Sequence, residues 1–357
     1  MSELIQKNGS RATVRWKLLT GASALALAAY VSSAGTAKAE DASYPSIWLE
    51  LDGQFAEQQT GAELYSAPFM SQSPFDGISQ LDIEKAAPTI WDKGAKITFQ
   101  PEGSGWVLSL GARYGKIGRS ETREGHPSIA TSKYSGPLYS AYQHLSAQSS
   151  EGHFILDFQA GKDVGIGRFG SGGSSVISGG VRIAQFNSRN HVDIKSQPTN
   201  LPTGTYVGGV NRFYASFAAK RRFTGMGPSL SWDASADIAG NSADGAISLD
   251  WGVNGAVLFG RQRTEIHHHT SKAHFLWFSR TFAYQVASTP PARSRNVTVP
   301  NLGAFAGVSW RYADAKITLG YRADYFFNVL DGGIDAAKKE DRGFYGPFAA
   351  ISVGIGD

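Results

Sequence analysis

The chain has 357 residues, of which 41% are hydrophobic and 18% are charged, and it contains no Cys. The absence of Cys excludes disulfide scaffolds, thiolate metal sites and cysteine nucleophiles. The formal net charge of +4 comes from the first 39 residues, which carry one acidic residue, Glu3, and five basic ones, Lys7, Arg11, Arg15, Lys17 and Lys38. The remainder is neutral, so we expect no nucleic-acid partner.

Residues 1–39 have the three parts of a secretory signal. A basic stretch ends at Lys17, an apolar run covers residues 18–34, and Ala37-Lys38-Ala39 gives the small-x-small pattern of a cleavage site. The apolar run is shorter than the ~20 residues that a membrane-spanning helix needs. We therefore predict a signal peptide over residues 1–39, cleaved after Ala39, and an exported chain of residues 40–357. An uncleaved anchor is the alternative.

After residue 40 the dominant pattern is alternation of apolar and polar residues. Alternation with period 2 predicts strands that have one dry face and one wet face. It is clearest in residues 229–238, where Leu230, Trp232 and Ala234 alternate with Ser and Asp. In chain order, strands are expected near 47–55, 95–100, 106–115, 154–161, 175–187, 211–221, 229–238, 249–259, 273–288, 302–312, 317–327 and 343–356.

The composition of the two faces favours a transmembrane barrel over a soluble sandwich. The polar face is rich in Gly, Ser, Asp, Arg and Asn, which suit a wet interior. The apolar face carries aromatic residues at or near segment ends, as expected for girdles at the two membrane interfaces; these are Trp48, Trp106, Tyr114, Trp251, Trp310, Tyr312, Tyr321 and Tyr325. The predicted fold class is all-β, a single antiparallel transmembrane β-barrel of about 12 strands, with ten or fourteen also possible.

The predicted connections alternate between long and short. Long loops on the extracellular side and short turns on the periplasmic side are typical of outer-membrane barrels. Loops 56–92 and 117–152 are the longest, and we expect them to constrict or shield the mouth. Residues 222–226 and 240–245 are expected as short connections, and the short 240–245 segment does not fit the alternation. An even strand number places both termini on the periplasmic side.

Charged residues within the expected strands fall on the polar parity. A basic side chain that faces lipid costs ~2–4 kcal/mol at the bilayer midplane, so these side chains are predicted to point inward. The candidate pore-lining residues are Glu50, Asp52, Lys96, Arg113, Asp157, Arg182, Asp233, Asp237, Asp250, Arg311, Arg322 and Asp324. We expect separate sectors in the wall. The negative residues are Asp233, Asp237 and Asp250, with Glu50 and Asp52 on the first strand, and the positive ones are Arg182, Arg212 and Lys220. The alternative is that the charges pair with one another and fill the interior.

Three motifs carry little functional weight. Residues 165–170 match G-x-G-x-x-G, but no helix follows, so we interpret them as a periplasmic turn. The run His267-His268-His269 has no partner spacing for a metal site and is interpreted as a solvated turn. No G-x-S-x-G elbow is present. His126, His144 and His153 flank the second long loop and keep a hydrolase site at the barrel rim open as an alternative.

Six short strings resemble the Legionella-type pore-forming outer-membrane protein family, the relatives of the major outer-membrane protein of that genus. The resemblance runs over residues 154–357. The strings are Leu156 to Gly161, Ser178 to Ala184, Phe223 to Pro228, Val257 to Gly260, Leu319 to Arg322 and Gly346 to Phe348. The family implies a single-chain, pore-forming outer-membrane barrel without catalytic residues to carry over. One departure is the C-terminus, which ends in Gly356-Asp357 and not in an aromatic residue.

These observations predict a passive outer-membrane channel for small hydrophilic solutes, with weak ion selectivity and no enzymatic activity, cofactor or metal. Outer-membrane lipid, lipopolysaccharide and small solutes are the expected partners, and an oligomer is possible. A closed structural or adhesive barrel and, less favoured, a rim hydrolase remain as alternatives.

Overall fold

A computed structural model describes the backbone of residues 47–59, 63–65, 81–83, 89–101, 105–117, 120–124, 144–164, 174–196, 210–241, 245–276, 279–288, 292–333 and 337–355. The predicted signal peptide and its cleavage site lie outside these residues, as does the Gly-rich motif 165–170. The described residues include no helix that is long and apolar enough to cross a membrane.

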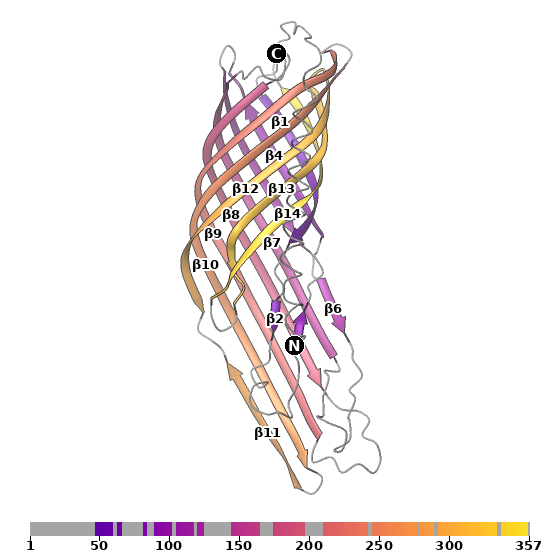
Figure 1. Ribbon diagram of the computed structural model, residues 1–357, viewed down its shortest axis with the longest axis vertical. Coiled ribbons are helices and arrows are strands. Elements are labelled where there is room, and N and C mark those ends of the chain that lie inside the picture. Colours follow the sequence, from indigo (N-terminus) through magenta and orange to yellow (C-terminus); the bar gives the residue numbers. More distant parts are fainter. Residues whose placement is uncertain are drawn as a thin grey trace, which may run out of the picture.

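Ten strands of the described chain form a closed antiparallel barrel (Figure 1). In chain order they are β1 (Ile47–Gln59), β4 (Thr89–Phe99), β5 (Trp106–Lys116), β7 (His144–Asp163), β8 (Ser174–Ser196), β9 (Val210–Asn241), β10 (Gly245–Leu276), β12 (Arg293–Tyr312), β13 (Ala315–Asp331) and β14 (Lys339–Ile355). Each pairs with the next in chain order, and β14 closes the ring on β1 with Ile355 opposite Ile47. Closure leaves no free sheet edge within the ring itself.

Four shorter strands lie outside the ring. β6 (Ser120–Glu124) pairs with β7, and β11 (Ser279–Ser288) pairs with the distal part of β10. β2 (Glu63–Tyr65) and β3 (Leu81–Ile83) form a separate two-stranded sheet. The prediction of about twelve barrel strands is therefore wrong in number, although the closed antiparallel class is confirmed.

Two causes account for the difference in strand number. The strands expected at 211–221 and 229–238 are one strand, β9, which continues through the expected turn at 222–226. Residues 273–288 do not form a barrel strand, because they are divided between the end of β10 and β11. His267, His268 and His269 likewise lie within β10 and not in a turn.

The two ends of the barrel differ in their connections. Residues 100–105, 164–173, 242–244 and 313–314 join strands at one end, here called the short-turn end, where β1 begins and β14 ends. Residues 60–88, 117–143, 197–209, 277–292 and 332–338 join strands at the opposite, long-loop end. With β9 continuous, the connection 242–244 falls among the short turns and no longer interrupts the alternation.

The barrel wall is much taller on one side. β9 and β10 have 32 residues each, whereas β4 and β5 have 11 each. Figure 1 shows that β7 to β10 continue well beyond the end of β1 and β4, toward the long-loop end. Their outer parts therefore form a projecting sheet.

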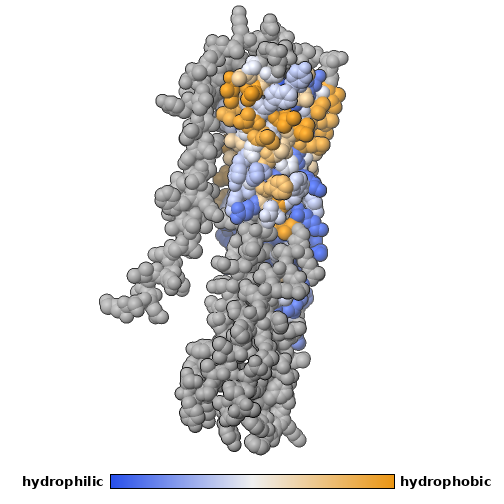
Figure 2. Space-filling view, turned by 90° about the vertical axis from the view of Figure 1, so that its right-hand side faces the viewer, coloured by the Kyte–Doolittle hydropathy of each residue, from blue (hydrophilic) through white to orange (hydrophobic). Residues whose placement is uncertain are grey.

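The outward face of the barrel carries an apolar belt. Leu51, Phe158 and Leu230 are 65–68% exposed, and large apolar side chains alternate with inward-facing residues along each barrel strand. Figure 2 shows this belt near the short-turn end and a hydrophilic surface beyond it. A soluble monomer rarely exposes so extensive an apolar surface, whereas lipid covers one without cost.

Most of the expected girdle residues are on this belt. Trp106, Tyr114, Trp310, Tyr312 and Tyr321 are 49–54% exposed. Three are placed differently. Trp48 is half-buried with the Arg311 guanidinium 5.6 Å from its ring centroid, and Trp251 is buried against Ala234 and Ala236. Tyr325 is half-buried, and its hydroxyl donates to Asp341 Oδ2 at 2.9 Å. Local packing therefore overrides the aromatic pattern at these three positions.

Two adjacent glycines in β8 differ in how closely the neighbouring strands approach them. A Cβ atom added at Gly180 would overlap the carbonyl oxygen of Phe158 on β7, whereas one added at Gly179 would lie 3.6 Å from Leu230 Cδ2, an ordinary contact. We expect Gly180→Ala to destabilise the barrel by about 1–3 kcal/mol, because backbone must move to make room. Gly179→Ala should leave the urea unfolding midpoint nearly unchanged. Equal midpoints for the two variants would contradict this close approach.

Candidate functional site

The barrel interior is built in three layers that follow one another from the short-turn end. Along β13, for example, the inward residues pass from Lys316 through Arg322 and Asp324 to the buried ring of Phe326. Along β7 they pass from Gln159 through Asp157 to Ile155. We call the layers the polar chamber, the ionic layer and the closing layer.

The polar chamber is a cavity of about 310 Å³. Its wall extends from Ser174 and Lys316 near the short-turn end to Asn254 and Asp324 deeper in the barrel. Lys316 Nζ lies 2.6 Å from Asp250 Oδ2, and Ser352 Oγ donates to Glu50 Oε2 at 3.1 Å. Small and charged side chains thus leave room for water and small polar solutes.

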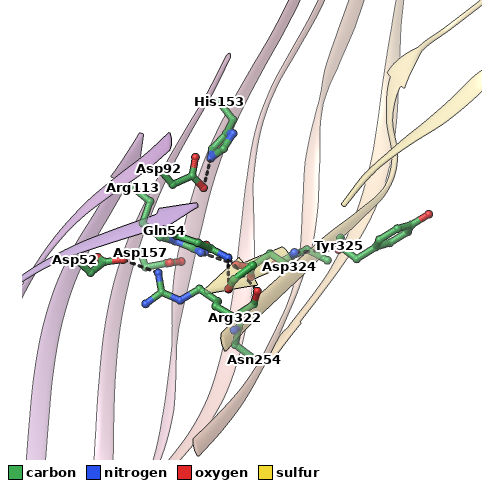
Figure 3. Close-up of polar contacts among 12 residues, drawn as sticks. Asp52, Gln54, Asp92, Arg113, His153, Asp157, Asn254, Arg322, Asp324 and Tyr325 are labelled. Carbon is green, nitrogen blue, oxygen red and sulfur yellow. Dashed lines mark hydrogen bonds and ion pairs between the residues drawn. The ribbon is translucent and has the colours of Figure 1, made fainter. Parts of the chain in front are cut away.

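The ionic layer forms the deep wall of the chamber and consists of Asp52, Arg113, Asp157, Arg182, Arg322 and Asp324. Figure 3 labels all of them except Arg182. Three ion pairs join these residues. Arg113 Nη1 lies 2.5 Å from Asp324 Oδ2, Arg182 Nε lies 2.6 Å from Asp157 Oδ1, and Arg322 Nη1 lies 2.6 Å from Asp52 Oδ2.

The ionic layer connects strands across the interior. Arg113 on β5 and Asp324 on β13 are not neighbours in the sheet, so their pair crosses the lumen. Arg182 also donates to the side-chain oxygens of Asn254 and Asn301 on β10 and β12. Gln54 donates to the backbone carbonyls of Arg322 and Gly346, at 2.9 and 3.3 Å. Charge-assisted hydrogen bonds of this kind hold side chains in fixed positions.

The closing layer is an apolar core inside the barrel. Its residues come from or directly follow every strand of the ring and are at most 7% exposed: Ala56, Ile90, Ile117, Ile155, Ala184, Phe186, Phe223, Ala256, Leu258, Val299, Phe326, Val329, Leu330 and Phe344. Phe186 lies at its centre, with ring centroids 4.8 Å from Phe326, 6.1 Å from Phe344 and 6.3 Å from Phe223. These rings pack across the lumen and close it.

An irregularity in β13 completes the closing layer. The register with β14 shifts between Phe326 and Leu330, and Asn328 has a φ of 55°. Its amide donates to Asp341 Oδ1 at 2.6 Å, and its carbonyl accepts from Gln262 Nε2 at 2.6 Å. A bulge breaks the alternation of side chains along a strand. Val329 and Leu330 are consecutive residues, yet both are buried.

A second set of charges lies on the far side of the closing layer. Arg342 is bound by Glu151, with Nε 2.9 Å from Oε2, and by Glu340, with Nη1 2.7 Å from Oε1. His153 Nε2 lies 3.2 Å from Asp92 Oδ2, and the His153 ring packs 4.3 Å from the Phe344 ring centroid (Figure 3). The apolar core is therefore enclosed between two charged layers.

The structure brings ten of the twelve candidate pore-lining residues to the wall of the polar chamber. The other two, Asp237 and Arg311, lie outside its lining. That any of the twelve lines a conducting path stays a prediction. The expected separation into charged sectors is wrong. Asp157 lies directly opposite Arg182 in the sheet, Asp250 is paired with Lys316, and Lys220 is exposed on the outer surface. The side chain of Arg212 lies outside the described residues.

Sequence reasoning missed the closing layer, although a signal for it exists. Ile155, Phe186, Phe326 and Phe344 are large apolar residues on the parity that otherwise carries polar side chains. These apolar exceptions to the polar parity all lie at one level of the barrel. The strand register shows this alignment, whereas the sequence alone does not. Gln54, Asp92 and Glu151 were missed because their roles depend on cross-lumen partners.

One of the three histidines on which the hydrolase alternative rests, His153, lies inside the barrel. His153 is buried between Phe186 and Phe344 and lies next to Asp92. His126 and the side chain of His144 lie outside the described residues. Within the part of the chain that the structure describes, no three His, Asp or Glu residues come together in a way that could hold a metal ion.

Comparison with known proteins identifies the family. Residues 129–355 match the family described as the Legionella pneumophila major outer membrane protein precursor. The chain belongs to this family. Together with the apolar belt, membership places the protein in the outer membrane. No curated protein matches the chain.

The solved structures to which the chain is similar include a protease, an autotransporter unit and a transporter. The outer membrane protease OmpT from Escherichia coli is 10% identical, with a TM-score of 0.38 over 88% of this chain and 99% of that one. The transport unit of the autotransporter AIDA-I from Escherichia coli is 8% identical, with a TM-score of 0.27 over 93% and 97%. The toluene transporter TodX from Pseudomonas putida is 10% identical, with a TM-score of 0.24 over 88% and 89%. Scores this low establish no functional relationship.

The cross-lumen pair of Arg113 and Asp324 should stabilise the barrel measurably. Asp324→Asn alone leaves a buried guanidinium without its counter-charge and should cost about 3–5 kcal/mol. A double-mutant cycle with Arg113→Gln should give a coupling energy of about 0.5–3 kcal/mol in urea unfolding.

The matched control for this cycle is the exposed pair of Arg263 and Glu265, whose Nη2 and Oε1 atoms lie 2.9 Å apart with side chains 64% and 34% exposed. Exposed pairs contribute below about 1 kcal/mol. Equal coupling energies for the two pairs would show that the ionic layer does not hold the wall together.

Proposed function

We propose that this protein is an outer-membrane channel for small hydrophilic solutes, closed in its resting conformation by the closing layer. The polar chamber is the observation that carries the proposal, because a protein that used the barrel only as an anchor would not need a charge-lined cavity of about 310 Å³ inside it. Family membership supports an outer-membrane barrel and leaves the activity open.

The proposed path has two parts. Solute enters the chamber among Glu50, Lys96 and Asp233, which line its wall. It then meets the ionic layer and the closing layer, where the phenylalanine rings are at most 3% exposed. Passage requires these rings to separate, so conduction should be intermittent. We propose the long-loop end as the extracellular side, because the first barrel strand, β1, begins and the last, β14, ends at the opposite, short-turn end.

The closing layer itself favours a second candidate, a structural barrel that never conducts. Fourteen buried residues from all around the ring form a continuous core, as in the interior of a soluble domain. On this alternative the interior charges serve stability, and the projecting sheet of β7 to β10 carries the function at the cell surface.

Single-channel recording on the refolded protein separates the two candidates. We expect the wild type to show small, infrequent openings. Phe186→Ala together with Phe344→Ala removes two central rings and should raise the frequency of opening at least tenfold. Phe158→Ala is the matched control, because Phe158 is 65% exposed on the outer belt and faces lipid. The single Phe344→Ala variant serves if the double variant does not fold.

The recordings can also refute the proposal. If wild type and ring variants migrate as folded barrels and none of them conducts, the protein is a structural barrel. If wild type already conducts steadily, the closing layer is not the gate, and the solute path lies elsewhere.

The chamber charges should set a weak ion preference once the path is open. Asp250 is neutralised by Lys316 at 2.6 Å, whereas Asp233 accepts a hydrogen bond from the neutral hydroxyl of Ser231, at 3.5 Å. Asp233→Asn should therefore lower the cation-to-anion permeability ratio more than Asp250→Asn does. Asn keeps the size of the side chain. Reversal potentials in a salt gradient, measured on the ring variant, give the ratio, and an unchanged ratio for Asp233→Asn would remove it from the path.

A further inference from the structure

A cluster of basic side chains lies on the outer surface of β8, β9 and β10. We call it the basic patch; it consists of Arg189, Lys220, Arg222, Arg261 and Arg263, all exposed. These residues have the parity of the lipid-facing residues, so they belong to the outside of the barrel and not to the interior. None of the chamber or ionic-layer residues is among them.

The patch begins where the apolar belt ends. On β9 the outward residues run from Leu230 and Met226, which are 68% and 57% exposed, to Arg222 and Lys220. On β10 they run from Phe259, 59% exposed, directly to Arg261 and Arg263. The charges therefore lie at the level at which lipid tails give way to headgroups, at the long-loop end.

The sheet register places like charges side by side. Arg189 on β8 lies directly opposite Lys220 on β9, and Arg222 on β9 lies directly opposite Arg263 on β10. Like charges in directly opposite positions destabilise a sheet. In the interior the register places opposite charges side by side, since Asp157 lies opposite Arg182 and Glu50 opposite Lys96.

Neighbouring protein groups neutralise little of this charge. Glu265 pairs with Arg263 at 2.9 Å and lies directly opposite Lys220 in the sheet, and this single carboxylate can offset one of the five positive charges of the patch. Arg222 Nε donates to Asn187 Oδ1 at 2.9 Å and Arg261 Nε to Ser294 Oγ at 2.5 Å, and both acceptors are neutral. The side chains are thus held in place while their positive charge is left for an external anion.

We propose that the basic patch binds the phosphate groups of a phosphorylated glycolipid in the outer leaflet of the outer membrane. Arginine binds phosphate oxygens in a bidentate manner, and basic clusters beside a bilayer attract anionic headgroups. Continuity with the belt selects a lipid as the source of phosphate, because the acyl chains of the same molecule would cover Phe259 and Met226. The proposal rests on the long-loop end facing outward.

At the long-loop edge of the apolar belt, β4 and β5 differ from the strands that carry the basic patch. On β4 and β5 the belt ends at Trp91 and Tyr114, which are 46% and 50% exposed. Aromatic residues of this kind are the usual interface anchors. Lys93 and Lys116 are also exposed on these two strands, but they accompany aromatic residues and do not form like-charged rows.

Titration of the refolded full-length protein in zwitterionic micelles tests the proposal, with bisphosphorylated lipid A as the probe. We expect the Arg222→Gln, Arg263→Gln double variant to raise the apparent Kd about tenfold or more, and added salt to weaken binding to the wild type. Lys93→Gln with Lys116→Gln, which removes the same charge from β4 and β5, should change the Kd less than twofold.

Three outcomes would overturn the proposal. Equal binding of dephosphorylated lipid A would show that acyl chains suffice. Competition by millimolar inorganic phosphate would indicate a general anion site and not a lipid site. An equal loss in the Lys93 and Lys116 variant would indicate net charge alone. Conductance of the Arg222 and Arg263 variant, measured in parallel, keeps this result separate from the channel proposal, because the patch lies outside the lumen.

Discussion

The structure depends on one constraint, that the charges inside the barrel must find their counter-charges there. The outer face is occupied by lipid, so a strand that carries Arg113 or Asp324 has to turn it inward. An unpaired charge in a closed interior costs several kcal/mol, and the three ion pairs of the ionic layer relieve that cost. Two of them, Arg113 with Asp324 and Arg322 with Asp52, also connect strands that are not neighbours in the sheet. The layers on either side can then pack against a rigid floor.

The same constraint explains why a closing layer is compatible with a membrane barrel. With the charges of the ionic layer and of Arg342 paired with counter-charges, the space between the two layers is free for apolar side chains. Phe186, Phe326 and Phe344 fill it, and their burial adds stability that a water-filled lumen would lack. Phenylalanine rings carry no charge, so the rings of such a gate can separate without breaking an ion pair of their own.

The fold was largely predictable because alternation is a local property. Residues 229–238 read as a strand with Leu230 outward and Asp233 inward, and the structure agrees. Strand number was not predictable, because nothing near Arg222 shows whether a basic pair ends a strand or lies on a projecting one. The chamber wall followed from parity, but the pairing of Arg113 with Asp324 did not, since it joins residues 211 positions apart. The closing layer required the register of all ten strands.

Because the wall is taller on one side, its two sides end at different distances from the membrane. Strands rise about 3.3 Å per residue, so the 32 residues of β9 follow a path of roughly 100 Å, whereas the 11 residues of β4 cover about 36 Å. With the long-loop end outward, as proposed, the tips of β9 and β10 therefore extend farther from the membrane than the low side of the rim does. Antibodies and phages would meet the tall side first. Sequence change at those tips can alter what they recognise without touching the ionic layer at the base.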